Sequence, residues 1–558
     1  YVTPLLRTFS EIKKEGVGPE KLREFVAEEE KQFQNVEDLH HGSGPHKGKM
    51  KGKYQEWERN ILKNKEMVAV YRDYQEKLQG VGYDYDDIIL SVVLRLESDE
   101  ILLQRLQEQY KYLLADEHQD TNQSQNRVLE LLCAHQSNPN IFVVGDEKQS
   151  IYRFQGANLA NFLYFHSRYP AAKIIMLKEN YRSTQSILDA SGSIMHAALI
   201  AKSEYPEKKI RIYSFQNVAP ENYFIARKIK RLVKNGADPK EIAVLYRDNR
   251  DAFPIRDILQ KSGVPYRVES DEQLLENNDI KNLFLILRAV ADFGSDGKLA
   301  QALYVDFLKI PSLDIYKLFE RRPYSLHDAL GSKNRMRALG VSCASRLNNF
   351  YSKLSLWNKR TYNKSAPQVF ESIVRESGFF DHVLAKEDYI EGIDRVRTIH
   401  SFAKRLAAEN KNYTLRDFVR HLELIEERGI SLRERKLATK RSAARLMTAH
   451  RAKGLEFDYV FIVGANMGHW GKRHTRQLLK PPLAPQISII DKEDDERRLF
   501  YVALTRARKG VYISYPRTRE DGRELFPSQF IEEISNAHKV LGNSEIYEKG
   551  LERDPKIF

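Results

Sequence analysis

Two adjacent carboxylates, Asp116 and Glu117, follow the apolar run 112–115, and the hydrogen-bonding side chains 119–122 come directly after them. An aspartate at the carboxyl end of a strand can hold Mg²⁺, and the acid beside it can polarise an attacking water. The pair is therefore a candidate for metal-assisted hydrolysis of a nucleotide. Taken alone, two neighbouring acids at a strand end are more often a solvated turn, so this interpretation needs support from other segments.

A phosphate-cradling glycine loop would be the usual companion of such acids. The pattern Gly, four residues, then Gly-Lys-Ser/Thr does not occur in the 558 residues. The nearest stretch, GSGPHKGKM at 42–50, has a different glycine spacing and no Ser or Thr after Lys49. We interpret it as a solvated basic loop.

The segment 143–157, VVGDEKQSIYRFQGA, contains a second set of candidate residues. The neutral amide of Gln149 could orient a water or sense a terminal phosphate. Tyr152 and Phe154 flank Arg153, and this mixture of aromatic and basic side chains suits stacking on unpaired bases. The alternative is that the two aromatic rings pack under a loop.

Three later segments add further candidates. Tyr181 and Arg182, in LKENYRST, could stack on a purine and reach a phosphate. Glu456 projects from a Lys-Gly turn between two apolar runs, and Arg506 could act as an arginine finger on a developing phosphate charge. Each single basic site of this kind is more commonly part of a solvated face.

The elements that must position these residues can also be predicted. Short apolar, β-branched runs alternate with helical stretches at 112–116, 140–146, 173–177 and 241–248. This alternation is typical of a parallel sheet with crossover helices. From about 279 to 440 the pattern is amphipathic and helical, and strands resume at 444. The sequence thus predicts an α/β fold interrupted by a helical insertion.

Composition restricts the class of protein. Hydrophobic residues make up 42% and charged residues 30%, and neither a membrane-spanning run nor a signal-peptide pattern occurs. Cys133 and Cys343 are too few for a disulfide framework or zinc site, so we expect a reducing, cytoplasmic compartment. The net charge of +13 favours a polyanionic partner such as nucleic acid, although a merely basic surface explains the charge equally well.

Taken together and in order, these segments closely resemble the superfamily 1 DNA helicases of the UvrD/Rep/PcrA type. Five ordered segments carry the resemblance, which spans roughly residues 55–535: DEHQDTNQSQ, VGDEKQSIYRFQGA, ENYRST, LMTAHRAKGLEF and DDERRLFYVALTRAR. The resemblance implies an α/β fold of the P-loop NTPase type, with tandem RecA-like motor domains, the first incomplete, and mainly helical inserted subdomains.

The resemblance also implies domain boundaries. The five expected segments are the end of the first motor's helical insertion (1–105), the rest of the first motor (106–176), the two parts of the second motor (177–278 and 441–558), and its helical subdomain (279–440). Because the family's phosphate loop is absent and the chain begins at Tyr1, we expect that an N-terminal segment with the Walker A loop is missing here.

The family roles transfer to matching positions. Those at the nucleotide are Asp116 for Mg²⁺, Glu117 as the base for water, Gln149, Arg182 and Arg506 at the γ-phosphate, Tyr181 on adenine and Glu456 at the sugar. Those at DNA are Tyr152 and Phe154 for the bases, and Thr448 with His450 for the backbone. Three positions depart from the family pattern. The family usually has Phe at the position of His118, Trp at that of Phe154 and Arg at that of Gln155. We expect His118 to be packed and hydrogen-bonded, and Gln155 to remove one phosphate or DNA contact.

The implied function is that of an ATP- and Mg²⁺-dependent DNA helicase or translocase of 3′–5′ polarity. It would act on single-stranded DNA and single-strand/duplex junctions in repair, replication or recombination, with accessory repair proteins as possible partners and no membrane partner. Without a Walker A segment, the chain by itself is expected to be inactive. The alternative is a catalytically inactive, helicase-derived DNA-binding or scaffold subunit.

Overall fold

The computed structural model describes most of the chain, in two units. The described residues are 2–41, 43, 46–79, 82–136, 138–151, 159–269, 274–320, 325–386, 389–410, 412–427, 432, 442–471, 479–483, 492–519 and 521–554. Unit 1 comprises Tyr1–Ser270 with Arg441–Phe558, and unit 2 comprises Asp271–Lys440. No helix within these described ranges is both long enough and apolar enough to cross a membrane.

The centre of unit 1 is a seven-stranded sheet in which every pair of neighbouring strands is parallel. Its strands, in spatial order, are β11 (Lys539–Leu541), β5 (Ile210–Phe215), β10 (Ala507–Pro516), β9 (Phe457–Ile462), β6 (Ile242–Tyr246), β8 (Ala444–Thr448) and β7 (Tyr266–Val268). The central strand β6, IAVLY, is buried at every position, as expected for a parallel strand covered on both faces.

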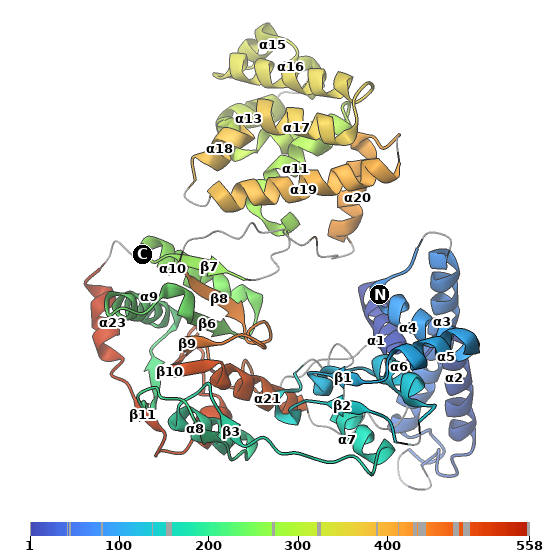
Figure 1. Ribbon diagram of the computed structural model, residues 1–558. Coiled ribbons are helices and arrows are strands. Elements are labelled where there is room, and N and C mark those ends of the chain that lie inside the picture. The colour runs from blue at the N-terminus through green and yellow to red at the C-terminus, as the bar shows by residue number, and fades with distance from the viewer. Residues whose placement is uncertain are drawn as a thin grey trace. The chain divides into compact units, whose positions relative to one another are not determined.

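Helices cover both faces of this sheet. One core joins the sheet to α8 (Gln185–Met195) and α21 (Lys492–Thr505). The other joins it to α9 (Val218–Lys234), α10 (Ala252–Lys261) and α23 (Glu545–Glu552). Figure 1 shows these two groups of helices on opposite sides of the strands. This arrangement confirms the predicted α/β fold class.

The N-terminal part of unit 1 contains a second, smaller parallel sheet. Its strands are β1 (Leu113–Ala115) and β2 (Ile141–Val143). The helices around it are α1 (Val2–Lys14), α2 (Pro19–Gln34), α3 (Gly52–Gln79), α4 (Tyr85–Ser98), α5 (Glu100–Gln109), α6 (Gln123–Cys133) and α7 (Leu159–Arg168).

The prediction of a strand at 173–177 is wrong. This segment has no regular secondary structure, and Ile174, Ile175, Met176 and Leu177 are between 64% and 77% exposed. The only strands nearby are the short pair β3 (Glu179–Asn180) and β4 (Ile200–Ala201). An apolar, β-branched run forms a strand only where a neighbouring strand accepts its hydrogen bonds, and no described strand lies beside 173–177.

Unit 2 is helical throughout its described part. Its longer helices are α11 (Asn278–Ala291), α16 (Ala344–Arg360), α17 (Ala366–Glu376), α19 (Tyr389–Glu409) and α20 (Leu415–Glu427), with the shorter α12 (Asp296–Leu303), α13 (Ser312–Glu320), α14 (Leu326–Leu330), α15 (Lys333–Ala338) and α18 (Phe379–Leu384). One continuous core with Trp357 and Phe418 fully buried holds them together. The assignment of 279–440 as an inserted subdomain of the second motor stays a prediction.

Candidate functional site

Asp116 and Glu117 leave the carboxyl end of β1. Glu117 has a left-handed backbone, with φ 50° and ψ 38°, and its N–H donates to the Asp116 carboxylate at 2.8 Å. The Gln119 side chain donates to the Glu117 carboxylate and accepts from the Asp146 N–H at 3.0 Å. Gln119 therefore ties the end of β1 to the turn after β2. A non-glycine residue with positive φ at a strand end is strained, and such strain concentrates at functional sites.

The exposed carboxylate of Asp116 is suited to Mg²⁺. This ion keeps several waters and is usually held by one or two carboxylates together with substrate phosphates. The described residues contain no group of three or more His, Cys, Asp or Glu side chains that could hold a metal ion. The single Asp116 carboxylate fits such a site, in which water and phosphate oxygens supply the other ligands.

Lys453 is a site residue that the sequence interpretation missed. It follows β8 in the Lys-Gly turn, and its side chain is only 5% exposed. Its ammonium pairs with Asp120, donates to the backbone carbonyl of Gln149 at 2.6 Å, and lies 3.8 Å from the Glu117 carboxylate. Burial raises the pKa of Asp120, and the contact with Lys453 opposes that rise. In the sequence, the signal for this role is a single lysine in LMTAHRAKGLEF, where a Lys-Gly pair also predicts an ordinary turn.

Arg506 is buried at the end of α21, with 2% of its surface exposed. Its guanidinium donates to the backbone carbonyls of Val502 at 3.1 Å and Leu455 at 3.4 Å. Burial, followed by the nearby charge of Arg182, lowers the pKa of Arg506 to about 10. The side chain is thus positively charged at neutral pH, and Tyr501, Glu117 and Glu456 favour that charge.

Gln149 joins the two halves of the site. Its side-chain oxygen accepts from the Arg506 guanidinium at 3.1 Å, and its amide donates to the Asp146 carboxylate at 2.8 Å. Both polar atoms of one neutral side chain therefore contact charged groups, one after β2 and the other after α21.

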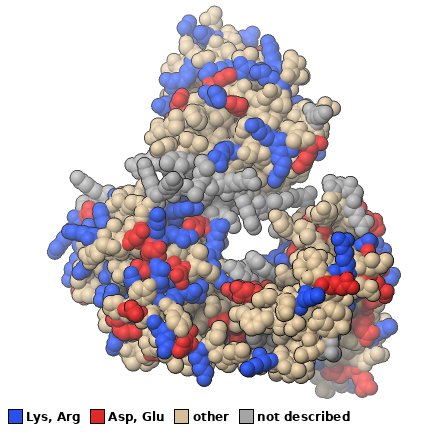
Figure 2. Space-filling model, viewed as in Figure 1, with Lys and Arg blue, Asp and Glu red and all other residues tan. Residues whose placement is uncertain are grey.

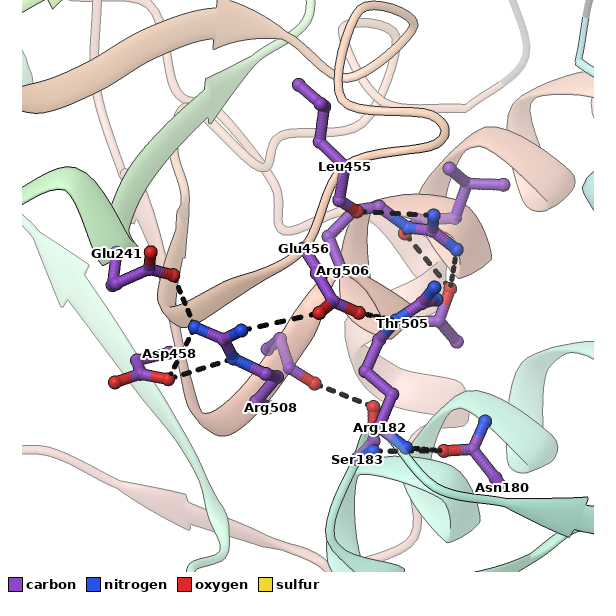
Figure 3. Close-up of polar contacts among 12 residues, drawn as sticks. Asn180, Arg182, Ser183, Glu241, Leu455, Glu456, Asp458, Thr505, Arg506 and Arg508 are labelled. Atoms are coloured by element: carbon purple, nitrogen blue, oxygen red, sulfur yellow. Dashed lines mark hydrogen bonds and ion pairs between the residues drawn. The ribbon is translucent and has the colours of Figure 1, made fainter. Parts of the chain in front are cut away.

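Arg182 is held in a network of opposite charges, shown in Figure 3. Its Nε lies 2.7 Å from the Glu456 carboxylate, which also lies 3.3 Å from Arg508. Arg508 in turn pairs with Asp458 at 2.9 Å. The contact with Arg182 is the main reason why the pKa of Glu456 is lowered. The Asn180 side chain fixes the turn by accepting from the backbone N–H of Arg182 at 3.0 Å.

Tyr181 presents a free ring face. It is 72% exposed, and its hydroxyl donates to the Glu179 carboxylate at 2.7 Å. Its position next to Arg182 places an exposed aromatic ring at the edge of the charged network. That arrangement suits stacking on a planar base.

The predicted DNA-contacting residues fall into two groups. Tyr152 and Phe154 lie outside the described residues, as does Gln155, which differs from the family pattern. Thr448 and His450 are half-buried at the end of β8. Burial, with the charge of Arg247, lowers the pKa of His450 to about 4, so this histidine is neutral at physiological pH. A DNA contact by His450 would therefore be a hydrogen bond rather than an ion pair.

His118 is packed, as expected for this departure from the family pattern. Only 1% of its surface is exposed, and its ring lies edge-on to Phe165 with centroids 5.4 Å apart. Its Nδ1 lies 3.5 Å from the Thr121 hydroxyl, and burial lowers its pKa. The histidine occupies the apolar position without adding a charge.

The parallel sheets and the helices that surround them have the arrangement of tandem RecA-like domains of the P-loop NTPase type. A family model described as the UvrD/REP helicase N-terminal domain matches residues 3–170, and the UvrD-like helicase C-terminal domain matches 175–338 and 331–518. The chain belongs to the UvrD/Rep family of DNA helicases.

Individual relatives agree with this placement. The chain is 30% identical over 493 residues to the ATP-dependent DNA helicase PcrA of Staphylococcus aureus strain Mu50, covering 84% of this chain and 64% of the relative. It is 29% identical over 523 residues to PcrA of Staphylococcus epidermidis strain RP62A, covering 88% and 68%. The chain thus spans about two thirds of the length of these relatives.

Proposed function

We propose that the protein is an ATP-dependent DNA helicase or translocase that moves 3′–5′ on single-stranded DNA and at single-strand/duplex junctions. Repair, replication and recombination are the processes that use such an activity, and accessory repair proteins are its expected partners. The observation that carries the proposal is the Gln149 side chain held between Asp146 and Arg506. A neutral sensor that contacts charged groups from two parts of the motor is what coupling of hydrolysis to movement requires.

Each residue has a proposed role in that reaction. Glu117 accepts a proton from the attacking water, and Arg182 and Arg506 stabilise the charge that develops on the transferred phosphate. Tyr181 stacks on the adenine, and Glu456 orients the sugar. Asp116 would hold Mg²⁺, which neutralises phosphate charge when bound. Tyr152, Phe154, Thr448 and His450 are proposed to contact DNA.

The charge distribution supports a polyanionic partner. The sequence between Asp328 and Glu371 contains no acid and eight basic residues: Lys333, Arg335, Arg337, Arg346, Lys353, Lys359, Arg360 and Lys364. Figure 2 shows Lys and Arg side chains along this α15–α16 end of unit 2. Binding through such residues should weaken steeply with salt, because it depends on neutralising phosphates.

The proposal is tested by DNA-stimulated ATP turnover and strand displacement of the full-length gene product. Turnover that rises with single-stranded DNA, and unwinding of a duplex with a 3′ tail, is the expected result. A protein that binds DNA but neither hydrolyses ATP nor unwinds would instead be the scaffold subunit. The absence of the Gly-x4-Gly-Lys-Ser/Thr pattern from the printed sequence is the one observation that favours this second function.

The purified 558-residue chain is expected to turn over ATP very slowly, even with single-stranded DNA present. Its sequence contains no glycine loop of the kind that cradles the phosphates, so the nucleotide would lack its main anchor. A coupled phosphate-release assay checks this. Fast turnover that Glu117→Gln abolishes would show that these 558 residues bind the phosphates in another way.

Lys453→Met is expected to destabilise unit 1 by about 3 kcal/mol, the lower end of the cost of breaking a buried ion pair, and to lower DNA-stimulated turnover. The substitution keeps the apolar stem but leaves the partly buried Asp120 without its cation, and an unpaired buried charge is costly. Urea unfolding measures the loss. The double variant Lys453→Met/Asp120→Asn is the matched control, because it removes both charges and should recover most of the stability. Equal stability of the single and double variants would contradict the ion-pair role.

A further inference from the structure

A second group of cations lies on the α9 face of the large sheet, and none of its members contacts the site residues above. We call Lys208, Arg211, Lys228 and Arg231 the α9 cation cluster. Lys228 and Arg231 are three residues apart on α9, so they are neighbours on one side of that helix. Arg211 on β5 is the register partner of Tyr512 on β10, which places both on the same face of adjacent strands.

Lys228 joins the helix to the strands within this cluster. Its ammonium lies 4.8 Å from the centre of the Tyr512 ring. Tyr512 is 7% exposed and stacks on Phe461 with centroids 4.8 Å apart, so the ring belongs to the core. Lys208, which precedes β5, lies 5.6 Å from the neighbouring Tyr459 ring. Lys208, Arg211 and Lys228 therefore lie beside Tyr459 and Tyr512, on the neighbouring strands β9 and β10.

Lys228 is buried without a carboxylate partner. It is 6% exposed, and among the described residues its ammonium forms a cation–π contact with the Tyr512 ring and no ion pair. Burial is the main cause that lowers its pKa to about 8, and Arg211, Arg231 and Lys208 lower it further. A lysine normally avoids this combination of burial and like charge, because both disfavour its ammonium.

Two acids of the surrounding elements have partners outside the cluster. On α9, Glu221 accepts from Ser514 and from the Gly464 N–H. On β9, Asp458 contacts Arg508 and Lys509.

The remaining packed elements do not neutralise the cluster either. The strands β5, β10 and β11 contain no acid. On α23, Glu548 accepts from the Gln216 N–H and Glu545 pairs with Lys549. Tyr547 of the same helix faces Arg211 and Arg231, and burial raises its pKa, so it stays a neutral phenol. On α10, Asp257 pairs with Arg256. Among the described residues, no carboxylate forms an ion pair with any of the four cations, so the α9 cation cluster carries positive charge that an anion would stabilise.

We propose that the α9 cation cluster is a second anion site, separate from the nucleotide site, that binds a phosphate group. Two guanidinium groups and two ammonium groups match the oxygens of a phosphate, which Arg contacts in bidentate fashion. The Tyr512 ring is covered by Lys228 and cannot stack on a base, so the site would recognise the phosphate rather than a nucleobase. A free phosphoanion and a backbone phosphate of DNA share this chemistry.

The test compares Lys228→Met with Lys230→Met in the full chain. Lys230 lies two residues away on α9 and is exposed, with its ammonium on the Ser262 carbonyl, so it controls for loss of a positive charge from the same helix. Thermal unfolding is followed in sodium pyrophosphate and in sodium chloride of equal ionic strength. We expect pyrophosphate to raise the melting temperature of the wild type and of Lys230→Met more than that of Lys228→Met.

The arms of the experiment separate the two sources of phosphate. If Lys228→Met also weakens single-stranded DNA binding several-fold and reduces its salt dependence, the ligand is the DNA backbone. If only the pyrophosphate response is lost, the ligand is a free phosphoanion. An unchanged pyrophosphate response together with unchanged DNA affinity would overturn the proposal.

The melting temperature of the ligand-free protein provides a second test. Because the pKa of Lys228 is lower in the folded protein than in the unfolded chain, its charge costs stability below about pH 8, and this cost fades as pH rises toward 10. Lys228→Met should therefore raise the melting temperature at pH 7, by an amount that shrinks at pH 9.5. A lysine that serves the fold would give a lower melting temperature in the variant at both pH values, which contradicts the proposal.

Discussion

Glu117→Gln is expected to lower DNA-stimulated ATP turnover of the full-length protein by about 10³-fold, within the range that a general base contributes. Glutamine has the same shape and can keep the hydrogen bond with Gln119, but it cannot accept a proton from water. Binding of DNA and of nucleotide should change little. Initial rates of phosphate release, at saturating single-stranded DNA, measure the effect.

The matched control for this variant is Glu147→Gln. Glu147 is an exposed acid in the turn after β2, and its carboxylate lies 3.6 Å from the Lys148 ammonium at the surface. This substitution removes the same charge from a neighbouring turn. It should leave the rate of ATP turnover within about twofold of the wild type, because the Glu147 side chain contacts neither Gln149 nor Lys453. Similar losses in the two variants, or none in Glu117→Gln, would remove Glu117 from the reaction.

Arg506→Lys is expected to lower turnover by about 10²–10³-fold although it keeps the positive charge. An arginine finger is worth about 10³–10⁵ in rate, and lysine cannot reproduce the planar fork. Here that fork contacts Gln149, Val502 and Leu455 together. DNA affinity should be retained, so the effect appears in the catalytic rate rather than in DNA binding.

Because Arg506 is buried, the folding of this variant must be measured separately. Arg517→Lys is the matched control, since Arg517 is exposed and only reaches Glu548 at 4.0 Å. Gln149→Ala offers a second route to the same conclusion, because it leaves the backbone contacts of Arg506 in place. It should remove the stimulation of turnover by DNA while keeping the basal rate. Normal stimulation in Gln149→Ala would contradict the coupling role.

Much of the candidate site was predictable from the sequence because its motifs are local. A strand that ends in two acids, a Gly-Asp turn with a glutamine, and a basic helix end each depend on a dozen residues or fewer. Their order identified the family and the α/β fold, and the helical pattern of 279–440 indicated the all-helical segment. The strand predicted at 173–177 did not form for a related reason. This segment has the composition of a strand, but composition does not supply a neighbouring strand to pair with.

The sequence by itself determined the family, the fold class and the residue types available for nucleotide chemistry. Only the tertiary structure decided which of them meet: Lys453 reaches Asp120 across 333 positions, and Arg182 reaches Glu456 across 274. Burial likewise decided that His450 is neutral, and the fold places no carboxylate of the described residues against Lys228. The physical reason is that contact and desolvation depend on the register of strands and helices far apart in the chain, which no local pattern encodes.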